Sequence, residues 1–221
     1  MFFKNFQKTF CINGCALFND NSNFEYWENK KVTSDEIEIV KFINNKINNK
    51  KISILHIGIG NSYLASNITL FDKIDGITIS GNEKNFGDKL KINNYNIFFL
   101  NKLEKDIFIK KKIKNYDLII DVNIKSFCCC NKAFQKLFND YSYMLNENGL
   151  LITGKQGMNW SRLIKPVYSF SLKKFFYRRL KEYDGPKSNI LTIEQSDKIS
   201  RENNLTINYN TDQILIFKKN G

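Results

Sequence analysis

Two glycines that follow an apolar segment are the residues of this chain best suited to hold a ligand. Gly58 and Gly60 come directly after the apolar run Ile52–Ile57, and a helix-compatible segment begins near Ser62. Glycine has no Cβ, so the backbone of such a turn can approach a bound molecule closely. The N–H groups at the start of the next helix can meet a polar ligand. The pattern predicts a nucleotide-type cofactor site at the carboxyl end of the first strand.

A carboxylate at the end of a later strand is the second candidate for chemistry. Asp121 closes the apolar run Leu118–Ile120, and Asn123 follows two residues later. A carboxylate at the mouth of a parallel sheet can orient a nucleophile or accept its proton. The alternative interpretation is that Asp121 caps the loop before the next helix. We prefer the functional interpretation and take Asp121 and Asn123 as the predicted catalytic pair.

The single histidine is a weaker candidate. His56 has a side chain whose usual pKa suits acid–base chemistry, but it lies within the predicted strand Ile52–Ile57. We therefore expect a structural, hydrogen-bonded histidine in the sheet.

Polar and aromatic residues on two segments form a predicted substrate site. Lys155, Gln156 and Trp160 follow the fifth predicted strand, at the rim that also holds Asp121. They are suited to an anionic or polar substrate, and an ordinary surface loop with Trp160 in the core is the equal alternative. Tyr26 belongs to an aromatic segment before the first helix, which either closes over the cofactor as a lid or, as we slightly prefer, seals the sheet edge.

The composition is that of a globular protein with a basic surface. The 221 residues are 42% hydrophobic, and the formal net charge is +12. Such a charge favours anionic partners. No apolar run reaches the roughly 18 residues of a membrane-spanning helix, and no secretory signal is visible at the N-terminus. We expect a soluble, cytoplasmic protein with no transmembrane segment.

A basic segment and five cysteines need separate consideration. The segment Lys173–Arg179 combines four basic and three aromatic residues. Such a segment fits phosphates of nucleic acid or anionic lipid headgroups, or else a solvated helix face. Cysteines occur at positions 11, 15 and 128–130. Their odd number argues against a disulfide framework, and their spacing matches no common zinc finger. We predict buried thiols and no metal site.

Strand and helix patterns alternate along the chain. The predicted strands are Ile52–Ile57, Gly76–Ser80, Asn96–Leu100, Tyr116–Asp121, Leu150–Thr153, Leu205–Tyr209 and Gln213–Phe217. Capping boxes at Thr33–Glu36 and Thr192–Gln195 open two of the helices, and Asn148-Gly149 is expected to end the helix that carries Ala133–Leu145. The alternation predicts an α/β fold, Rossmann-like and doubly wound, with a mostly parallel sheet and an antiparallel C-terminal strand.

One domain accommodates this chain length. We divide residues 1–221 into an N-terminal helical or lid segment (1–50), a cofactor-binding half (51–154) and a substrate-side half (155–221).

The order of elements resembles the class I S-adenosylmethionine-dependent methyltransferases over roughly Thr33–Lys219. The motifs that carry the resemblance are His56–Gly60, Gly76–Ser80, Tyr116–Asp121, Asn148–Ile152 and Gln213–Lys218. The resemblance implies S-adenosylmethionine as cofactor. It implies that the glycine turn contacts the methionine and ribose parts, that the end of the third strand contacts adenine, and that Asp121 and Asn123 lie by the transferred methyl group. The implied cofactor-binding residues are Gly58, Gly60, Asn61, Ser62, Thr78, Glu83, Asn101 and Asp121.

The sequence departs from the family pattern at the second strand. The family usually has Asp or Glu at its end to accept hydrogen bonds from the ribose hydroxyls, whereas this chain has Thr78. A hydroxyl carries no charge and cannot accept two bonds as a carboxylate does. Glu83 follows five residues later, and we expect it to reach back from the start of the next helix.

We therefore expect a methyltransferase that acts on an oxygen or nitrogen of a small polar, anionic metabolite or sugar, including a sugar of a surface glycan. Another small-molecule transferase on the same fold stays open at this point, and so do two further alternatives. The first is an enzyme that binds RNA or other nucleic acid through the basic segment. The second is a member of the fold without catalysis that acts through interaction with other proteins.

Overall fold

The structure is a computed structural model that describes residues 31–46, 51–103, 108, 111, 113–125, 131–155 and 191–221. Several predictions fall outside these residues. They concern Tyr26, Gln156, Trp160, the basic segment Lys173–Arg179 and the five cysteines.

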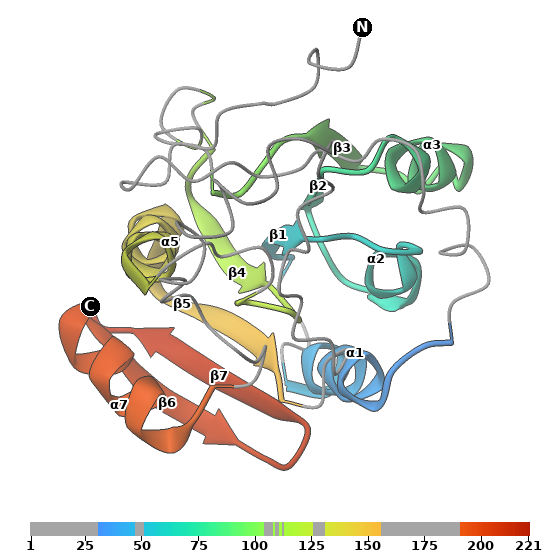
Figure 1. The fold of residues 1–221 in the computed structure, drawn as a ribbon. Coiled ribbons are helices and arrows are strands. Elements are labelled where there is room, and N and C mark those ends of the chain that lie inside the picture. The colour runs from blue at the N-terminus through green and yellow to red at the C-terminus, as the bar shows by residue number, and fades with distance from the viewer. Residues whose placement is uncertain are drawn as a thin grey trace, which may run out of the picture.

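A single seven-stranded sheet forms the centre of the described fold, with the order β3-β2-β1-β4-β5-β7-β6 (Figure 1). Strands β1 to β5 are mutually parallel, and β7 is antiparallel to both of its neighbours. This arrangement confirms the predicted fold class. The strands are β1 (Ser53–Ile57), β2 (Lys73–Thr78), β3 (Tyr95–Phe99), β4 (Tyr116–Ile120), β5 (Leu145–Gly154), β6 (Leu205–Asn210) and β7 (Ile214–Lys219).

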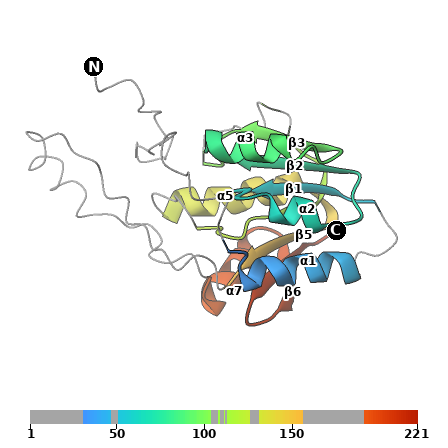
Figure 2. The ribbon, with the colours of Figure 1, turned by 90° about the vertical axis from the view of Figure 1, so that its right-hand side faces the viewer.

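Helices cover both faces of the sheet, as Figures 1 and 2 show from two directions. The described helices are α1 (Ser34–Lys46), α2 (Tyr63–Asn67), α3 (Gly81–Lys89), α5 (Asn131–Met144) and α7 (Ile193–Glu202). Apolar residues of α1 and α2 form one core with one face of the sheet, and those of α5 and α7 form a second core with the other face. Because strand side chains alternate between faces, each central strand contributes to both cores.

The helix starts follow the predicted capping residues. The Thr33 backbone N–H donates to the Glu36 carboxylate at 2.8 Å before α1. Thr192 and Gln195 form a reciprocal capping box at the start of α7.

Several predicted boundaries were wrong, including the starts of β2 at Lys73 and of β5 at Leu145. Strand β2 ends at Thr78 instead of Ser80, because the Ser80 hydroxyl accepts the Glu83 N–H and caps α3. Helix α5 ends at Met144, and Leu145 already pairs with Tyr116 in the sheet. The Asn148-Gly149 pair therefore does not end the helix. It lies within β5, where the pairing register shifts and Asn148 has a φ of +62°.

Candidate functional site

The strand order reverses direction between β1 and β4, at the middle of the sheet. Strands β2 and β3 follow β1 on one side of the sheet, and β4 lies on the other side of β1. Ligands of open α/β sheets bind at the carboxyl edge of such a point, because the two neighbouring loops diverge there. The glycine turn after β1 and the loop that begins at Asp121 after β4 lie on this edge.

The glycine turn after β1 leaves open space beside its backbone. Gly58 and Gly60 have φ angles of +71° and +52°, a region that residues with a Cβ rarely adopt. In the described part of the structure, no heavy atom lies within 4 Å of the point where a Cβ of either glycine would stand. The Gly58 N–H donates to the Ile77 carbonyl at 2.8 Å, which fixes the turn to β2. These features form a backbone cradle that a side chain would fill.

Two further residues predicted to bind cofactor complete this turn. The Asn61 side-chain oxygen accepts the Tyr63 N–H at 3.2 Å and so supports the start of α2. Ser62 is fully buried, and its hydroxyl lies 3.1 Å from the Tyr95 hydroxyl. Burial is the main reason that the pKa of Tyr95 is raised, so its hydroxyl stays protonated and holds this contact. The Ser62 side chain therefore braces the turn against β3.

A carboxylate from the next helix lies at the end of β2, where the strand itself ends in Thr78. The Thr78 hydroxyl donates to Glu83 at 2.5 Å and accepts the Ser80 N–H at 2.9 Å. Glu83 lies in the first turn of α3, where the helix dipole stabilises negative charge. Glu83 thus reaches back to the strand end, as the sequence predicted from the missing acid.

Asn101 lies directly beyond the end of β3, at the same edge. Its side chain is largely buried, and its oxygen accepts the Leu103 N–H at 2.9 Å. No described residue accepts from the amide nitrogen, so its donors can serve other contacts.

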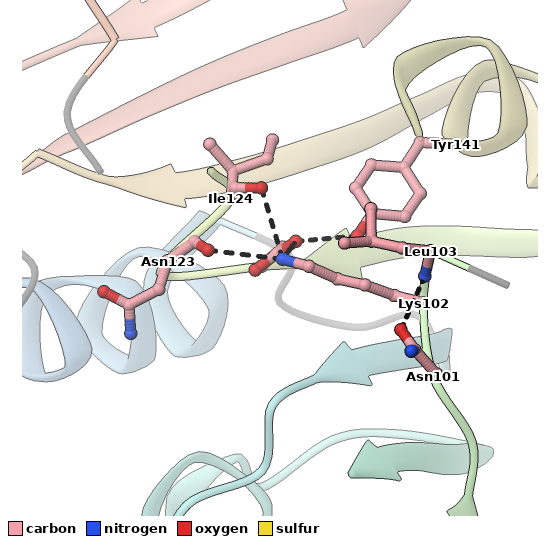
Figure 3. A network of polar contacts seen from close by, with 7 residues as sticks. Asn101, Lys102, Leu103, Asn123, Ile124 and Tyr141 are labelled. Atoms are coloured by element: carbon pink, nitrogen blue, oxygen red, sulfur yellow. Dashed lines mark hydrogen bonds and ion pairs between the residues drawn. The ribbon is translucent and has the colours of Figure 1, made fainter. Parts of the chain in front are cut away.

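The carboxylate of Asp121 is held in a buried polar network (Figure 3). Its Oδ2 accepts from the Lys102 ammonium at 2.7 Å and from the Tyr141 hydroxyl at 2.6 Å. Asp121 is 2% exposed and Lys102 8%. Lys102 also donates to the backbone carbonyls of Asn123 and Ile124, each at 3.2 Å. The network ties the loop after β3 to the loop after β4 and to α5.

Lys102 and Tyr141 were not predicted as site residues from the sequence. Lys102 follows a predicted strand end by two residues, and Tyr141 belongs to the apolar stripe of the predicted helix. A buried hydroxyl needs a partner, so Tyr141 in that stripe was the available signal for a polar contact to the sheet edge.

Among the described residues, three polar side chains at this edge have a buried oxygen without a hydrogen-bond partner, and they belong to Asp35, Asn123 and Thr153. Among the described residues, none donates to Asp35 Oδ2 or to Asn123 Oδ1, and both atoms are buried. The Asn123 side chain points away from the Lys102–Asp121 pair (Figure 3). Asp35 lies in the first turn of α1 and was not predicted as a site residue from the sequence.

Lys155 follows β5, but its ammonium contacts the turn between β6 and β7. It donates to Asn210 Oδ1 at 3.0 Å and to the Thr211 carbonyl at 2.5 Å. These contacts fix the end of β5 to the antiparallel pair of strands.

The described residues also bear on the single histidine, on metal binding and on membrane-spanning helices. His56 is 3% exposed within β1, as expected for a structural residue. In the ranges that the structure describes, no group of three or more His, Cys, Asp or Glu side chains is arranged to bind a metal ion. Within the same ranges, no helix has the length and apolar character needed to cross a bilayer.

The sequence matches no protein-family model and no curated protein sequence. Solved structures do match the fold. Magnesium protoporphyrin IX methyltransferase (ChlM) from Synechocystis PCC 6803, with bound SAH, aligns with a TM-score of 0.58 at 13% identity, over 90% of this chain and 95% of its own. N-methyltransferase NodS from Bradyrhizobium japonicum WM9, in complex with S-adenosyl-L-homocysteine, aligns with a TM-score of 0.56 at 13% identity. The alignment covers 90% of this chain and 93% of NodS.

An O-methyltransferase family protein from Burkholderia thailandensis aligns with a TM-score of 0.57 at 10% identity, over 84% of this chain and 56% of its own. Identities this low establish similarity of fold alone. The similarity agrees with the observed strand order and with the antiparallel final strand. The chain therefore has the fold of the class I S-adenosylmethionine-dependent methyltransferases.

Proposed function

We propose that this protein is an S-adenosylmethionine-dependent methyltransferase. The observation that carries the proposal is the open cradle at Gly58 and Gly60, which lies at the switch point of this fold and leaves room for a ligand against the backbone. The carboxylate of Glu83 at the end of β2 supports it, because it supplies the charge that ribose hydroxyls require.

The residues around the crevice have distinct proposed roles. Gly58, Gly60 and Asn61 would contact the methionine and ribose parts of the cofactor through the turn. Glu83 would accept from the ribose, with Thr78 holding its carboxylate in place. The Asn101 amide nitrogen would donate to adenine. Ser62 would act only through the backbone, because its hydroxyl contacts Tyr95.

When bound, the cofactor supplies a methyl group on a positively charged sulfur. Transfer requires mainly that the acceptor atom is aligned with that methyl group. Asp121 is enclosed by Lys102 and Tyr141, a geometry that suits a positioning residue better than a proton acceptor. Its network would hold Asn123 and the rest of the loop after β4 in register beside the cofactor.

The acceptor in this proposal is a small polar molecule that offers an oxygen or nitrogen, such as a metabolite or a sugar of a surface glycan. The expectation of an anionic acceptor rested on the net charge of +12 and on Lys155. The contacts of Lys155 with the β6–β7 turn give it a structural role, so the described residues add no support for that detail.

Calorimetry with S-adenosylhomocysteine tests the proposal. The ligand should bind and raise the melting temperature by linkage. In Gly60→Ala the new methyl group enters the cradle, so binding should fall at least about tenfold, while the strained backbone costs roughly 1–2 kcal/mol of stability.

Asn148→Ala is the matched control for that strain. Asn148 has a φ of +62° and lies at the amino end of β5, away from the crevice. Its variant should lose stability and keep affinity. A wild-type protein that gives neither heat nor thermal shift with saturating S-adenosylhomocysteine would refute the proposal.

A further inference from the structure

Among the described residues, the buried carboxylate of Asp35 accepts on one of its two oxygens only. Its side chain is fully buried, and Oδ1 accepts the Glu36 N–H at 3.0 Å. No described residue donates to Oδ2. Burying an ionised carboxylate is unfavourable unless it is paired with donors. Asp35 is therefore suited to a donor from outside the described chain.

The position of Asp35 places this oxygen at the carboxyl edge of the sheet. Oδ2 lies 2.2 Å from the point where a Cβ of Gly154 would stand, and the Val122 carbonyl oxygen lies 3.0 Å from the same point. The carboxylate thus packs against the last residue of β5 and beside the loop after β4. Glycine at position 154 makes this possible, because any side chain there would displace the carboxylate.

Asn123 adds a second oxygen of the same kind. It follows Val122 directly, and its buried Oδ1 also lacks a donor among the described residues. Its amide is directed away from the Lys102–Asp121 pair, toward the side of the view on which α1 (blue) lies (Figure 3). Thr153 Oγ1 is also without a donor there. Because neighbouring residues of a strand face opposite sides, Thr153 points away from the Gly154 side and is not part of this group.

We propose that Asp35 and Asn123 bind the ammonium group of a small methyl acceptor. An ammonium group has three N–H donors and no acceptor, which complements two unpaired oxygens. Its positive charge also compensates the buried carboxylate, whereas a hydroxyl brings a donor without charge and a second carboxylate is repelled. The proposal deepens the methyltransferase function above and rests on it. It concerns how the acceptor is recognised. The acceptor that it expects is an amine, where the sequence had led us to expect an anionic molecule.

The experiment uses full-length protein saturated with S-adenosylhomocysteine and a panel of fragments. Each amine in the panel has an alcohol and a carboxylate of the same skeleton, for example glucosamine, glucose and glucuronic acid. We expect the bound fragments to be amines. Asp35→Asn should raise their dissociation constants at least about tenfold, as the loss of a charge-assisted hydrogen bond does. Asn123→Leu should raise them less.

Glu36→Gln is the matched control, because it neutralises the next carboxylate in the same helical turn. Its side chain pairs with Thr33, and amine binding should stay unchanged. The proposal is overturned if no fragment binds, if carboxylates bind as well as amines, or if Asp35→Asn leaves amine binding intact.

The cofactor carries an ammonium group of its own, and a second ligand separates the two sources. 5′-Methylthioadenosine lacks the amino-acid part of the cofactor. If Asp35→Asn weakens S-adenosylhomocysteine and spares methylthioadenosine, the ammonium belongs to the cofactor and the acceptor assignment is wrong. We expect both nucleosides to bind the variant as they bind the wild type. If neither binds the wild type, the proposed function fails before this inference is reached.

Discussion

Two buried carboxylates at the carboxyl edge of the sheet differ in their surroundings. Asp121 accepts from an ammonium and a phenol on the same oxygen, and the ammonium goes on to two backbone carbonyls. Asp35 accepts one backbone N–H, and the described residues offer nothing to its second oxygen. The first carboxylate is part of the architecture. The second fits the proposed role of a ligand-binding group, since natural folds rarely bury an acceptor without a partner.

The largest expected effect comes from breaking the satisfied carboxylate. Lys102→Met leaves Asp121 buried without its cation, which should cost about 3–5 kcal/mol of unfolding free energy. Lys84→Met is the control, because Lys84 pairs with Asp88 at 2.7 Å on the exposed face of α3, where such pairs contribute little. Denaturant titration of both variants measures the difference. Equal losses would mean that the Asp121 network is not the stabilising element described here.

The contacts of these two carboxylates could not be predicted from the sequence, although the order of strands and helices could. The strand and helix order followed from periodicity and capping residues, and Glu83 was expected at the end of β2 because Thr78 lacks a charge. Lys102 and Asp121 are 19 residues apart, and no local pattern links them. Their contact depends on β3 and β4 ending at one edge with two strands between them.

Asp35 was missed for a different reason. A capping box makes an acid in the first turn of a helix look like a solvated residue that favours the helix dipole. Yet Asp35 is four residues before Ile39 and eight before Ile43, and so lies on the buried stripe of α1. The position of a charged residue in an apolar stripe indicated that Asp35 is buried. The capping pattern at Thr33–Glu36 favoured a solvated acid, and that interpretation prevailed.

Glu83 is a third carboxylate at this edge, which accepts from the Thr78 hydroxyl and is partly exposed. Glu83→Ala should weaken S-adenosylhomocysteine binding by about 1.5–3 kcal/mol. Thr78→Val should cost less, because it removes the support and keeps the charge. Calorimetry decides the order. If Thr78→Val is the more damaging change, the hydroxyl itself contacts the ligand and Glu83 has only a supporting role.

Asp75 belongs with Asp121 as a satisfied buried carboxylate. It accepts from Lys73 and Asn96, each at 3.1 Å, and from the Tyr116 hydroxyl at 2.6 Å. Burial, followed by the contact with Asp75, raises the pKa of Tyr116 above its usual value of 10.0.

A raised pKa means that the folded state holds this proton more tightly than the unfolded chain. The stabilisation is therefore complete below about pH 10 and is lost as the pH rises further, by up to about 1.4 kcal/mol per pH unit. Tyr116→Phe should be less stable at neutral pH and should show a shallower alkaline decline. Tyr143→Phe, with a side chain 59% exposed, should change neither. An unchanged alkaline slope in Tyr116→Phe would show that the contact between Tyr116 and Asp75 does not hold the phenol proton in the folded state.

The smallest expected effect tests the comparison between Asp35 and Asp121 most directly. Asp35→Asn keeps the oxygen that accepts the Glu36 N–H and replaces the unpaired oxygen by an N–H donor on the side of the Val122 carbonyl. Because no described residue donates to the oxygen that is replaced, the unfolding free energy without ligand should change by no more than about 0.5 kcal/mol or should rise. Asp121→Asn, which strands the Lys102 ammonium, should lose about 3–5 kcal/mol in the same titration. Comparable losses in the two variants would show that Asp35 has a partner within the folded chain, and the distinction between an architectural and a binding carboxylate would then have to be abandoned.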